Sequence, residues 1–215
     1  HKRISDGDMG ANTGGMGAYA PTPVMTKELD KIVYDTILLL AVKAMKKEGC
    51  LFKGCLYAGL MSTKDGPKVV EFNCRFGDPE TEAVLPLLES DLAKIMLACT
   101  KGTLKKDKVE WKNACAVDVV LASEGYPATH SSGEEIVGLE EAKKTGCLVF
   151  HAGSMKKKGR YFVNGGRVLN VAAVAPTLKE ARDKAYEGVS KISWRGMQYR
   201  HDIADKGLTR LKKRK

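Results

Sequence analysis

Residues 69–81 read VVEFNCRFGDPET, and this stretch decides the fold because an apolar, β-branched approach ends in closely spaced polar side chains. Alternate side chains of a strand share a face, so Glu71 and Asn73 are expected to project together from Cα atoms roughly 6.5–7 Å apart. Two oxygen ligands on one face suit a hard cation that keeps waters and also binds phosphate oxygens, as magnesium does. Arg75 lies one step further along, with a planar fork that suits a phosphate. The stretch predicts a magnesium–nucleotide site, whereas Glu-x-Asn alone also fits a solvated edge strand.

Further motifs extend this pattern to most of the chain. They are HKR at 1–3, NTGGMGAY at 12–19, LYAGLM at 56–61, VFHAG at 149–153 and NGGRVL at 164–169. With residues 71–81 they resemble, to about residue 207, the C-terminal half of the glycinamide ribonucleotide synthetase (phosphoribosylamine–glycine ligase) family, ATP-grasp enzymes of purine biosynthesis. The resemblance implies a nucleotide-binding ligase that uses ATP with magnesium or manganese. It would join glycine to 5-phosphoribosylamine through glycyl phosphate.

The resemblance also implies roles for the residues around the motif. The reaction brings a carboxylate close to a triphosphate, so metal ions and positive donors must offset the repulsion. Glu71 and Asn73 would hold the metal, and Arg75 would contact the transferred phosphoryl group or the acyl phosphate. Asp78 would either orient Arg75 or receive a substrate amine.

Three other segments are candidates for binding substrate or phosphate. Glycine-rich loops let amide N–H groups approach an anion without interference from a Cβ atom, although glycine clusters also mark simple turns. The resemblance favours such a cradle at Thr13, Gly14, Gly15, Met16 and Gly17. Lys2 and Arg3 are assigned an anion-binding role. Arg167 is the candidate for the ribose 5-phosphate, with a structural salt bridge as the alternative, and His151 is interpreted as a packed core histidine.

Composition limits the other classes of function. The net charge is +10, but the basic residues are spread out and no aromatic platform accompanies them, so no nucleic-acid partner is expected. No apolar run reaches the ~20 residues that span a bilayer, and no signal peptide is evident. The six cysteines lack Cys-x-x-Cys spacing, which favours reduced thiols in a cytoplasmic protein.

The pattern of elements predicts an α+β fold, the C-terminal half of an ATP-grasp fold followed by a small mixed-sheet subdomain with helices on one face. A loop-rich lead-in precedes a helix capped by Thr26, a hairpin and a helical region with a break near 90–91. The expected strands are 54–62, 67–73, 114–122, 147–152, 160–163 and 167–175, before a helix from Thr177 to about 192. The predicted domains are 1–105, 106–208 and a basic tail, 209–215.

The family's N-terminal domain and its nucleotide-clamping lysine would precede residue 1. The chain is therefore expected to be a fragment, inactive alone, whose partner is the missing N-terminal half of the same enzyme. One alternative is another purine-pathway ATP-grasp ligase or carboxylase. A second is a catalytically silent module that keeps the fold for an interaction.

Overall fold

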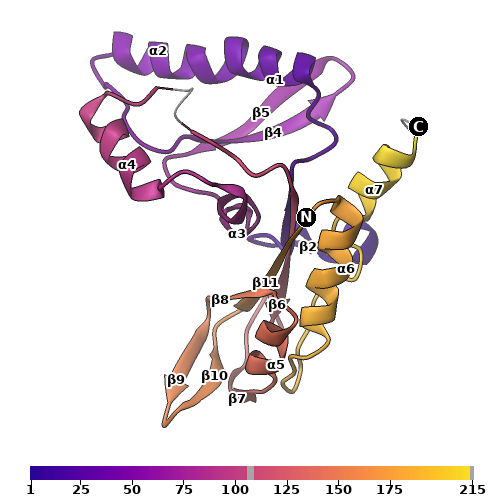
Figure 1. Ribbon diagram of the computed structural model, residues 1–215. Coiled ribbons are helices and arrows are strands. Elements are labelled where there is room, and N and C mark those ends of the chain that lie inside the picture. Colours follow the sequence, from indigo (N-terminus) through magenta and orange to yellow (C-terminus); the bar gives the residue numbers. More distant parts are fainter. Residues whose placement is uncertain (106–108, 214–215) are drawn as a thin grey trace. The chain divides into compact units, whose positions relative to one another are not determined.

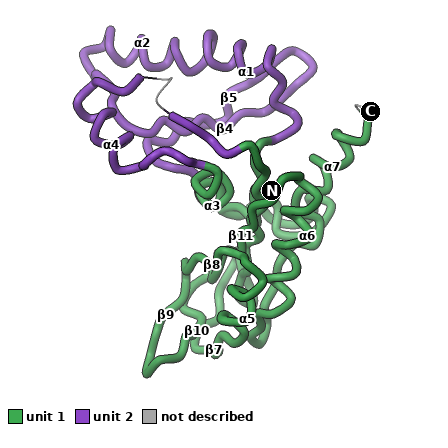
Figure 2. The backbone as a smooth tube through the Cα atoms, viewed as in Figure 1, with its two compact units in different colours: residues 1–21, 78–87, 113–215 green, residues 22–77, 88–112 purple. Residues whose placement is uncertain are grey.

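The computed structural model describes residues 1–105 and 109–213, which form two compact units (Figures 1 and 2). Unit 1 comprises residues 1–21, 78–87 and 113–215, and unit 2 comprises residues 22–77 and 88–112. This division differs from the predicted domains 1–105 and 106–208, because unit 1 includes segments from both of these ranges. The lead-in and residues 78–87 pack with the C-terminal part of the chain through contacts that are remote in sequence. No helix in the described ranges has the length and apolarity needed to cross a membrane.

The centre of unit 1 is a four-stranded sheet in the order β3-β6-β11-β8. These strands are β3 (Gly17–Ala20), β6 (Cys115–Ala122), β11 (Arg167–Ala175) and β8 (Leu148–His151). The predicted strands at 114–122, 147–152 and 167–175 are confirmed. All three pairings are antiparallel, so the expectation of mixed strand directions is corrected. The glycine-rich lead-in supplies an edge strand, because β3 is hydrogen-bonded to β6 from about a hundred residues away.

Both faces of this sheet are buried, which corrects the expectation of helices on one face. Val119 and Val171 face the core beneath α6 (Leu178–Val189), whose Thr177 and Glu180 form the predicted capping box. On the opposite face of β6, Asp118 and the residues two positions before and after it are also buried. The short helix α3 (Glu80–Val84), continued by η3 (Leu85–Leu87), contacts β3, β6 and β11 (Figure 1). The Gly-Asp-Pro sequence at residues 77–79 therefore leads directly into a helix that covers one face of the sheet.

A smaller antiparallel sheet completes unit 1, in the order β7-β10-β9. Its strands are β7 (Ser132–Ile136), β10 (Arg160–Asn164) and β9 (Ser154–Lys157), and α5 (Leu139–Lys144) follows β7. At the other end of the unit, β1 (Arg3–Ser5) pairs with β2 (Met9–Asn12) across the turn η1 (Asp6–Asp8).

The predicted basic tail is corrected in part, because α7 (Asp205–Lys212) includes residues 209–212. Arg182 of α6 holds the first turn of α7 through Asp205, with 2.7 Å between Nε and Oδ1. Leu208 packs against the core of unit 1. Residues 214 and 215 of the predicted tail lie outside the described residues.

Unit 2 contains the predicted helix that begins after Thr26 and the predicted hairpin. The helical region runs through α1 (Lys27–Val33), a π-helical segment η2 (Tyr34–Leu38) and α2 (Leu39–Lys47), and Thr26 caps it as expected. The hairpin pairs β4 (Tyr57–Thr63) with β5 (Gly66–Asn73). The predicted break near 90–91 is confirmed, since Asp91 caps the separate helix α4 (Leu92–Lys101).

Candidate metal and phosphate site

The end of the β4–β5 hairpin presents the two predicted metal ligands. Glu71 lies opposite Gly59 and Asn73 lies opposite Tyr57, so their spacing of two residues places both side chains on one face. Glu71 is exposed and Asn73 is partly buried. The register shifts between Gly59 and Leu60, where Val70 is the extra residue of a β-bulge just before the ligands. The geometry agrees with the strand on which the metal prediction rests.

Gly59 gives the side chain of Glu71 room to lie across the neighbouring strand. A Cβ atom at position 59 would stand 3.0 Å from Glu71 Cγ and 3.5 Å from Cε1 of Tyr57. The first distance is shorter than ordinary van der Waals contact, so a larger residue at position 59 would press on the Glu71 side chain and require it to shift by a few tenths of an ångström. The sequence marked Gly59 only as part of a motif. The pairing of Gly59 with Glu71 across the predicted hairpin is the signal that could have shown why position 59 is a glycine.

Arg75 lies beyond the end of β5, so it is not one of the strand residues that alternate with Glu71 and Asn73. Its Nη1 donates a hydrogen bond to the carbonyl oxygen of Phe76 at 2.9 Å, and the side chain is exposed. The other donors of the guanidinium fork are directed by no hydrogen bond or ion pair found in the described ranges. This geometry is compatible with a phosphate contact, which stays a prediction.

In unit 1, Arg167 and Asp78 form a two-point ion pair. Arg167 Nη1 and Nη2 lie 2.9 and 3.0 Å from the two oxygens of the Asp78 carboxylate, and Nη1 also lies 3.2 Å from the Asp78 carbonyl oxygen. The Arg167 side chain is only 22% exposed. The structural salt bridge given above as the alternative role of Arg167 is therefore present. It gives Asp78 a partner other than Arg75. Ribose phosphate binding by Arg167 stays a prediction.

The glycine-rich loop packs directly against this ion pair. A Cβ atom on Gly14 would lie 2.8 Å from the guanidinium carbon of Arg167. Gly15 has φ +130°, and a Cβ atom there would lie 2.3 Å from Cδ of Pro79. Gly17 opens β3, where a Cβ atom would lie 2.6 Å from the carbonyl oxygen of Asp118. The glycines are therefore required for the close packing of this loop, whatever else they contact.

The backbone N–H groups of the same loop already have hydrogen-bond partners, unlike the free donors of the predicted anion cradle. The Thr13 and Met16 N–H groups donate to the carbonyl oxygens of Lys2 and His1, both at 2.8 Å. The Gly14 N–H donates to the Tyr126 hydroxyl at 2.9 Å, and the Gly15 N–H donates to Thr13 Oγ1 at 2.9 Å. Thr13 and Met16 are also buried. These donors are engaged within the protein, because the loop is fixed by the segment before it and by Tyr126.

The N-terminal segment and Tyr126 thus support the loop. The side chain of Lys2 is exposed, while Arg3 Nη1 donates to the carbonyl oxygen of Gly10 at 2.6 Å. Tyr126 packs against Gly166, where a Cβ atom would lie 2.4 Å from Cδ2 of the ring. No local pattern indicates that the Tyr126 hydroxyl accepts a hydrogen bond from Gly14.

Two carboxyl groups, those of Asp118 and Glu82, interact electrostatically with the Asp78–Arg167 pair. Asp118 is fully buried, and burial, followed by the negative charges of Glu82 and Asp78, raises its pKa well above the usual value, while Arg167 opposes the shift. Asn170 Nδ2 donates to Asp118 Oδ2 at 3.3 Å. Burial also raises the pKa of Glu82. Within the described residues, Asp118 Oδ1 and Glu82 Oε2 are buried without a hydrogen-bond partner.

His151 differs from the core residue expected from the sequence. It is exposed at the end of β8, its ring stacks on Tyr161 with centroids 4.5 Å apart, and Nδ1 lies 2.8 Å from Ser154 Oγ. Partial burial and then the charge of Lys143 lower the pKa of the imidazole. The apolar run around it belongs to a strand at the edge of the sheet, which leaves this position open to solvent.

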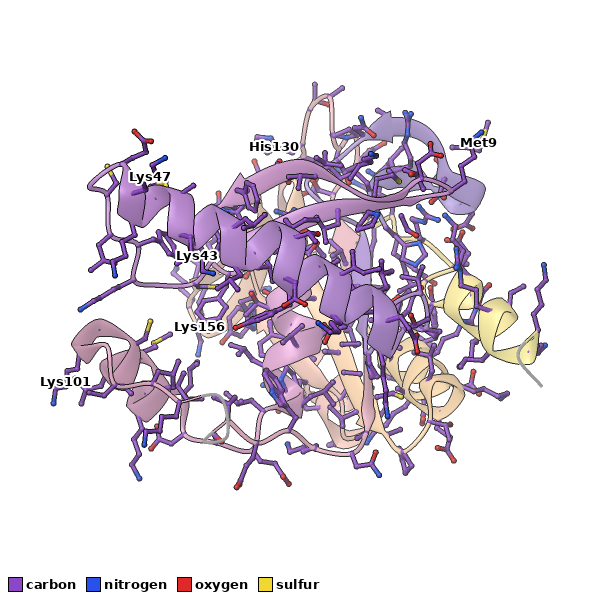
Figure 3. The ribbon with its side chains drawn as sticks, turned by 90° about the horizontal axis from the view of Figure 1, so that it is seen from above. Met9, Lys43, Lys47, Lys101, His130 and Lys156 are labelled. Atoms are coloured by element: carbon purple, nitrogen blue, oxygen red, sulfur yellow. The ribbon has the colours of Figure 1, made fainter. Side chains whose placement is uncertain are left out.

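The donor set at the hairpin fits a magnesium or manganese ion, which Glu71 and Asn73 would hold. One carboxylate and one amide oxygen are hard ligands of the type that these ions take. The described residues contain no cluster of three or more His, Cys, Asp or Glu side chains that could hold a metal by themselves. The basic residues elsewhere lie on separate elements, with Lys43 and Lys47 on α2, Lys101 on α4 and Lys156 on β9 (Figure 3).

Comparison with known proteins identifies both parts of the sequence. Residues 1–81 match the phosphoribosylglycinamide synthetase ATP-grasp (A) domain, and residues 116–206 match the phosphoribosylglycinamide synthetase C domain. The phosphoribosylamine–glycine ligase of Caldanaerobacter subterraneus is 50% identical over 204 residues, which cover 95% of this chain and 48% of that protein. The chloroplastic enzyme of Arabidopsis thaliana is 49% identical over 97% of this chain and 40% of its own length. The trifunctional purine biosynthetic protein adenosine-3 of Gallus gallus is 50% identical over 98% of this chain and 21% of its own length.

Solved structures agree with the sequence matches. Phosphoribosylamine–glycine ligase from Thermotoga maritima has a TM-score of 0.80 and 41% identity, covering 94% of this chain and 50% of that structure. A biotin carboxylase domain from Hydrogenobacter thermophilus, described as a complex with MgADP and bicarbonate, has a TM-score of 0.58 and 17% identity over 85% of this chain and 40% of its own, so it shares the fold alone. The chain therefore spans half or less of these relatives. It belongs to the phosphoribosylglycinamide synthetase family, of which it resembles the C-terminal half.

Proposed function

We propose that the chain supplies the metal- and phosphate-binding part of a phosphoribosylamine–glycine ligase, which forms an amide between glycine and 5-phosphoribosylamine through glycyl phosphate. The observation that carries the proposal is the hairpin end, where Glu71 and Asn73 share a face and Gly59 makes room for the Glu71 carboxylate. This arrangement occurs in a chain that is about 50% identical to phosphoribosylamine–glycine ligases.

Each residue of the site has a role in this proposal. Glu71 and Asn73 would hold magnesium or manganese, which when bound would supply charge neutralisation for ATP phosphates. Arg75 would direct the free donors of its guanidinium toward the transferred phosphoryl group. Arg167, held by Asp78, would face the ribose 5-phosphate. Because Gly14 lets the guanidinium approach the backbone, the loop at residues 13–17 would position Arg167 rather than bind an anion through its own amides.

The surface of unit 2 supports a role as part of a larger enzyme. The two-stranded sheet β4–β5 exposes large apolar side chains along β5, including Val69, Val70 and Phe72, and Met61 is exposed on β4. An isolated hairpin is marginally stable in water, and exposed apolar side chains gathered on one element indicate a surface that another segment covers. The N-terminal half of the same enzyme is the partner proposed here, and without it the chain is expected to be inactive. A cytoplasmic location belongs to the same proposal.

The test is ADP release with Mg-ATP, 5-phosphoribosylamine and glycine. It is measured for the chain alone and for the chain mixed with a separately produced N-terminal half of a related ligase. We expect glycine-dependent ADP release only in the mixture. It should be lost with Glu71→Ala and kept with Glu48→Ala, which removes an exposed carboxylate of unit 2 outside the hairpin.

Other outcomes would overturn parts of the proposal. Turnover by the chain alone would contradict its need for a partner. Dependence on formate or bicarbonate in place of glycine would indicate another purine-pathway ATP-grasp ligase or carboxylase. Silence in a mixture whose two parts demonstrably associate would indicate a catalytically silent module.

A further inference from the structure

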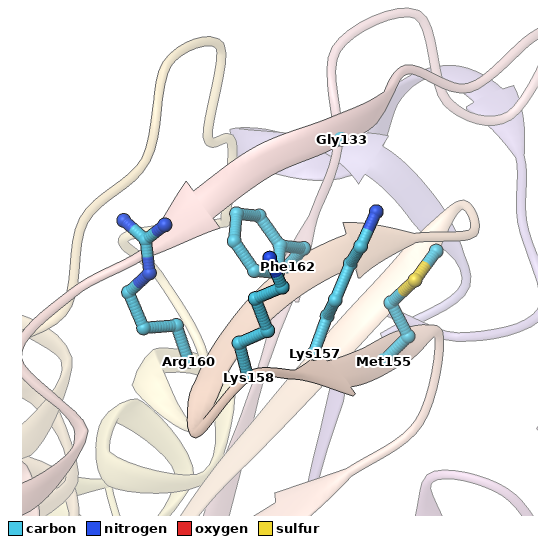
Figure 4. A pocket seen from close by; sticks show the side chains of 6 residues that line it. All are labelled: Gly133, Met155, Lys157, Lys158, Arg160 and Phe162. Carbon is cyan, nitrogen blue, oxygen red and sulfur yellow. The ribbon is translucent and has the colours of Figure 1, made fainter.

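One face of the three-stranded sheet in unit 1 contains a hollow whose residues have no role in the proposed ligase chemistry. It has a volume of about 350 Å³, within the range of small-ligand sites. Figure 4 shows the residues that line it, which are Gly133, Met155, Lys157, Lys158, Arg160 and Phe162. All of them belong to β7, β9 and β10 or to the turn between β9 and β10.

Strand register explains why these side chains gather on one face. Met155 pairs with Phe162 and Lys157 pairs with Arg160, so residues two apart on each strand point the same way. Lys158 is in the turn with φ +49°, which fixes where its side chain leaves the backbone. Lys156 has the opposite parity, and its Nζ lies 5.2 Å from the centre of the Tyr161 ring on the other face.

The hollow has an excess of positive charge. Arg160 Nη1 lies 2.8 Å from Glu135 Oε2, so this cation is paired. Lys157 and Lys158 form no ion pair with any side chain in the described ranges, and both are exposed. Three cations against one carboxylate leave a local surplus that suits an anion carrying one or two charges.

The apolar part of the hollow lies directly beside these cations. Phe162 is partly exposed and Met155 is exposed, so neither side chain is fully buried in the core. The guanidinium carbon of Arg160 lies over the Phe162 ring, 5.6 Å from its centre. Figure 4 shows the Phe162 ring between Arg160 on one side and Met155 on the other, with both lysine chains alongside. An inorganic anion would use only the cationic half of such a surface.

We propose that this hollow binds a nucleoside monophosphate, with its base against Phe162 and Met155 and its phosphate among Lys157, Lys158 and Arg160. Stacking on an aromatic ring is tolerant of base identity, and a cationic rim pairs with phosphate. The site is formed by residues of β9, β10 and their turn, whereas the proposed metal ligands belong to the β4–β5 hairpin. Binding here would therefore regulate or localise the protein without taking part in phosphoryl transfer.

The experiment is a titration of the 215-residue chain with AMP, followed by backbone amide NMR shifts and calorimetry. Adenosine, ribose 5-phosphate and inorganic phosphate are titrated separately. We expect saturable shifts on β9 and β10, with AMP binding about fivefold or more tighter than each of the three smaller probes, because each lacks one half of the contacts. Lys157→Ala and Lys158→Asn should each weaken AMP binding about fivefold, since asparagine also tolerates the backbone of position 158.

The controls separate this site from general attraction and from the ligase site. Phe162→Leu, which keeps an apolar side chain, should weaken AMP binding about tenfold and leave binding of inorganic phosphate unchanged. Lys156→Ala on the opposite face and Glu71→Ala in unit 2 should leave AMP binding unchanged. Three outcomes would each overturn the proposal. Lys156→Ala could weaken AMP binding as much as Lys157→Ala does, inorganic phosphate could bind as tightly as AMP, or β9 and β10 could show no saturable shift. Thermal unfolding of each variant is measured to check that it is folded.

Discussion

Replacing Asp118 with asparagine tests the electrostatics behind the Asp78–Arg167 pair. Asp118 is 0% exposed between the central sheet and α3, and Asn170 donates to one of its oxygens. In Asp118→Asn the amide oxygen can still accept that hydrogen bond, and the amide nitrogen takes the place of the oxygen that has no partner. Size and hydrogen bonding stay nearly constant, so the substitution isolates the cost of a buried ionisable group.

The sign of the effect follows from the raised pKa of Asp118. Above the ordinary carboxyl pKa the unfolded chain has released this proton while the folded protein still holds it, so the free energy of unfolding falls as the pH rises. The asparagine variant lacks this penalty. At pH 7.5 we expect it to be more stable by about 1.4 kcal/mol for each pH unit by which burial raises the pKa of Asp118, and to have a Tm higher by about 2–4 °C per kcal/mol. The difference should shrink toward zero as the pH falls to about 4.

The assay is urea unfolding of unit 1 followed by tryptophan fluorescence. Trp194 is 7% exposed in the core of unit 1, whereas Trp111 is 50% exposed in unit 2, so both proteins are compared in a Trp111→Phe background. Unfolding free energies are measured from pH 4 to pH 8. A stability difference that is independent of pH, or an asparagine variant that is less stable at pH 7.5, would refute the reasoning.

The other predictions concern the residues that hold the site in place. Gly59→Val should raise the Mg²⁺ concentration needed for half-maximal turnover of the reconstituted enzyme, because a Cβ atom there lies 3.0 Å from Glu71 Cγ; an unchanged Mg²⁺ requirement would contradict this. Arg167→Lys loses the two-point contact and should destabilise unit 1 by about 1 kcal/mol, an effect that disappears in an Asp78→Asn background; additive losses would show that the pair is not coupled. Gly15→Ala should destabilise unit 1 by about 1–3 kcal/mol through its backbone strain, and a neutral result in urea unfolding would argue against the φ of +130°.

Features that depend on neighbouring residues could be predicted from the sequence. Thr26 and the Thr177–Glu180 capping box begin helices because side chain and backbone partners are three residues apart. The β4–β5 hairpin follows from alternation around Lys64-Asp65-Gly66. Glu71 and Asn73 share a face for the same local reason, so this part of the candidate site needs no tertiary information.

Features that depend on distant residues could not be predicted in this way. The pairing of β3 with β6 makes the glycine-rich loop part of a sheet, and it fixes amide donors that looked available in the sequence. The partner of Asp78 is Arg167, 89 residues away. The stretch 209–215 is rich in Lys and Arg and resembles a tail, but its residues 209–212 belong to α7, which Arg182, Leu208 and the Lys206–Asp8 ion pair hold in place. None of these contacts leaves a periodic pattern in the chain.

The measurement that tests the central claim most directly is the Mg²⁺ dependence of ADP release by the enzyme reconstituted from this chain and an N-terminal half. Parent, Glu71→Gln and Asn73→Ala proteins are compared at saturating glycine and 5-phosphoribosylamine. If these side chains hold the metal, each variant should need about tenfold more Mg²⁺ for half-maximal turnover and should turn over more slowly at saturation. If both variants stay within about twofold of the parent in both quantities, the end of the hairpin does not form the metal site.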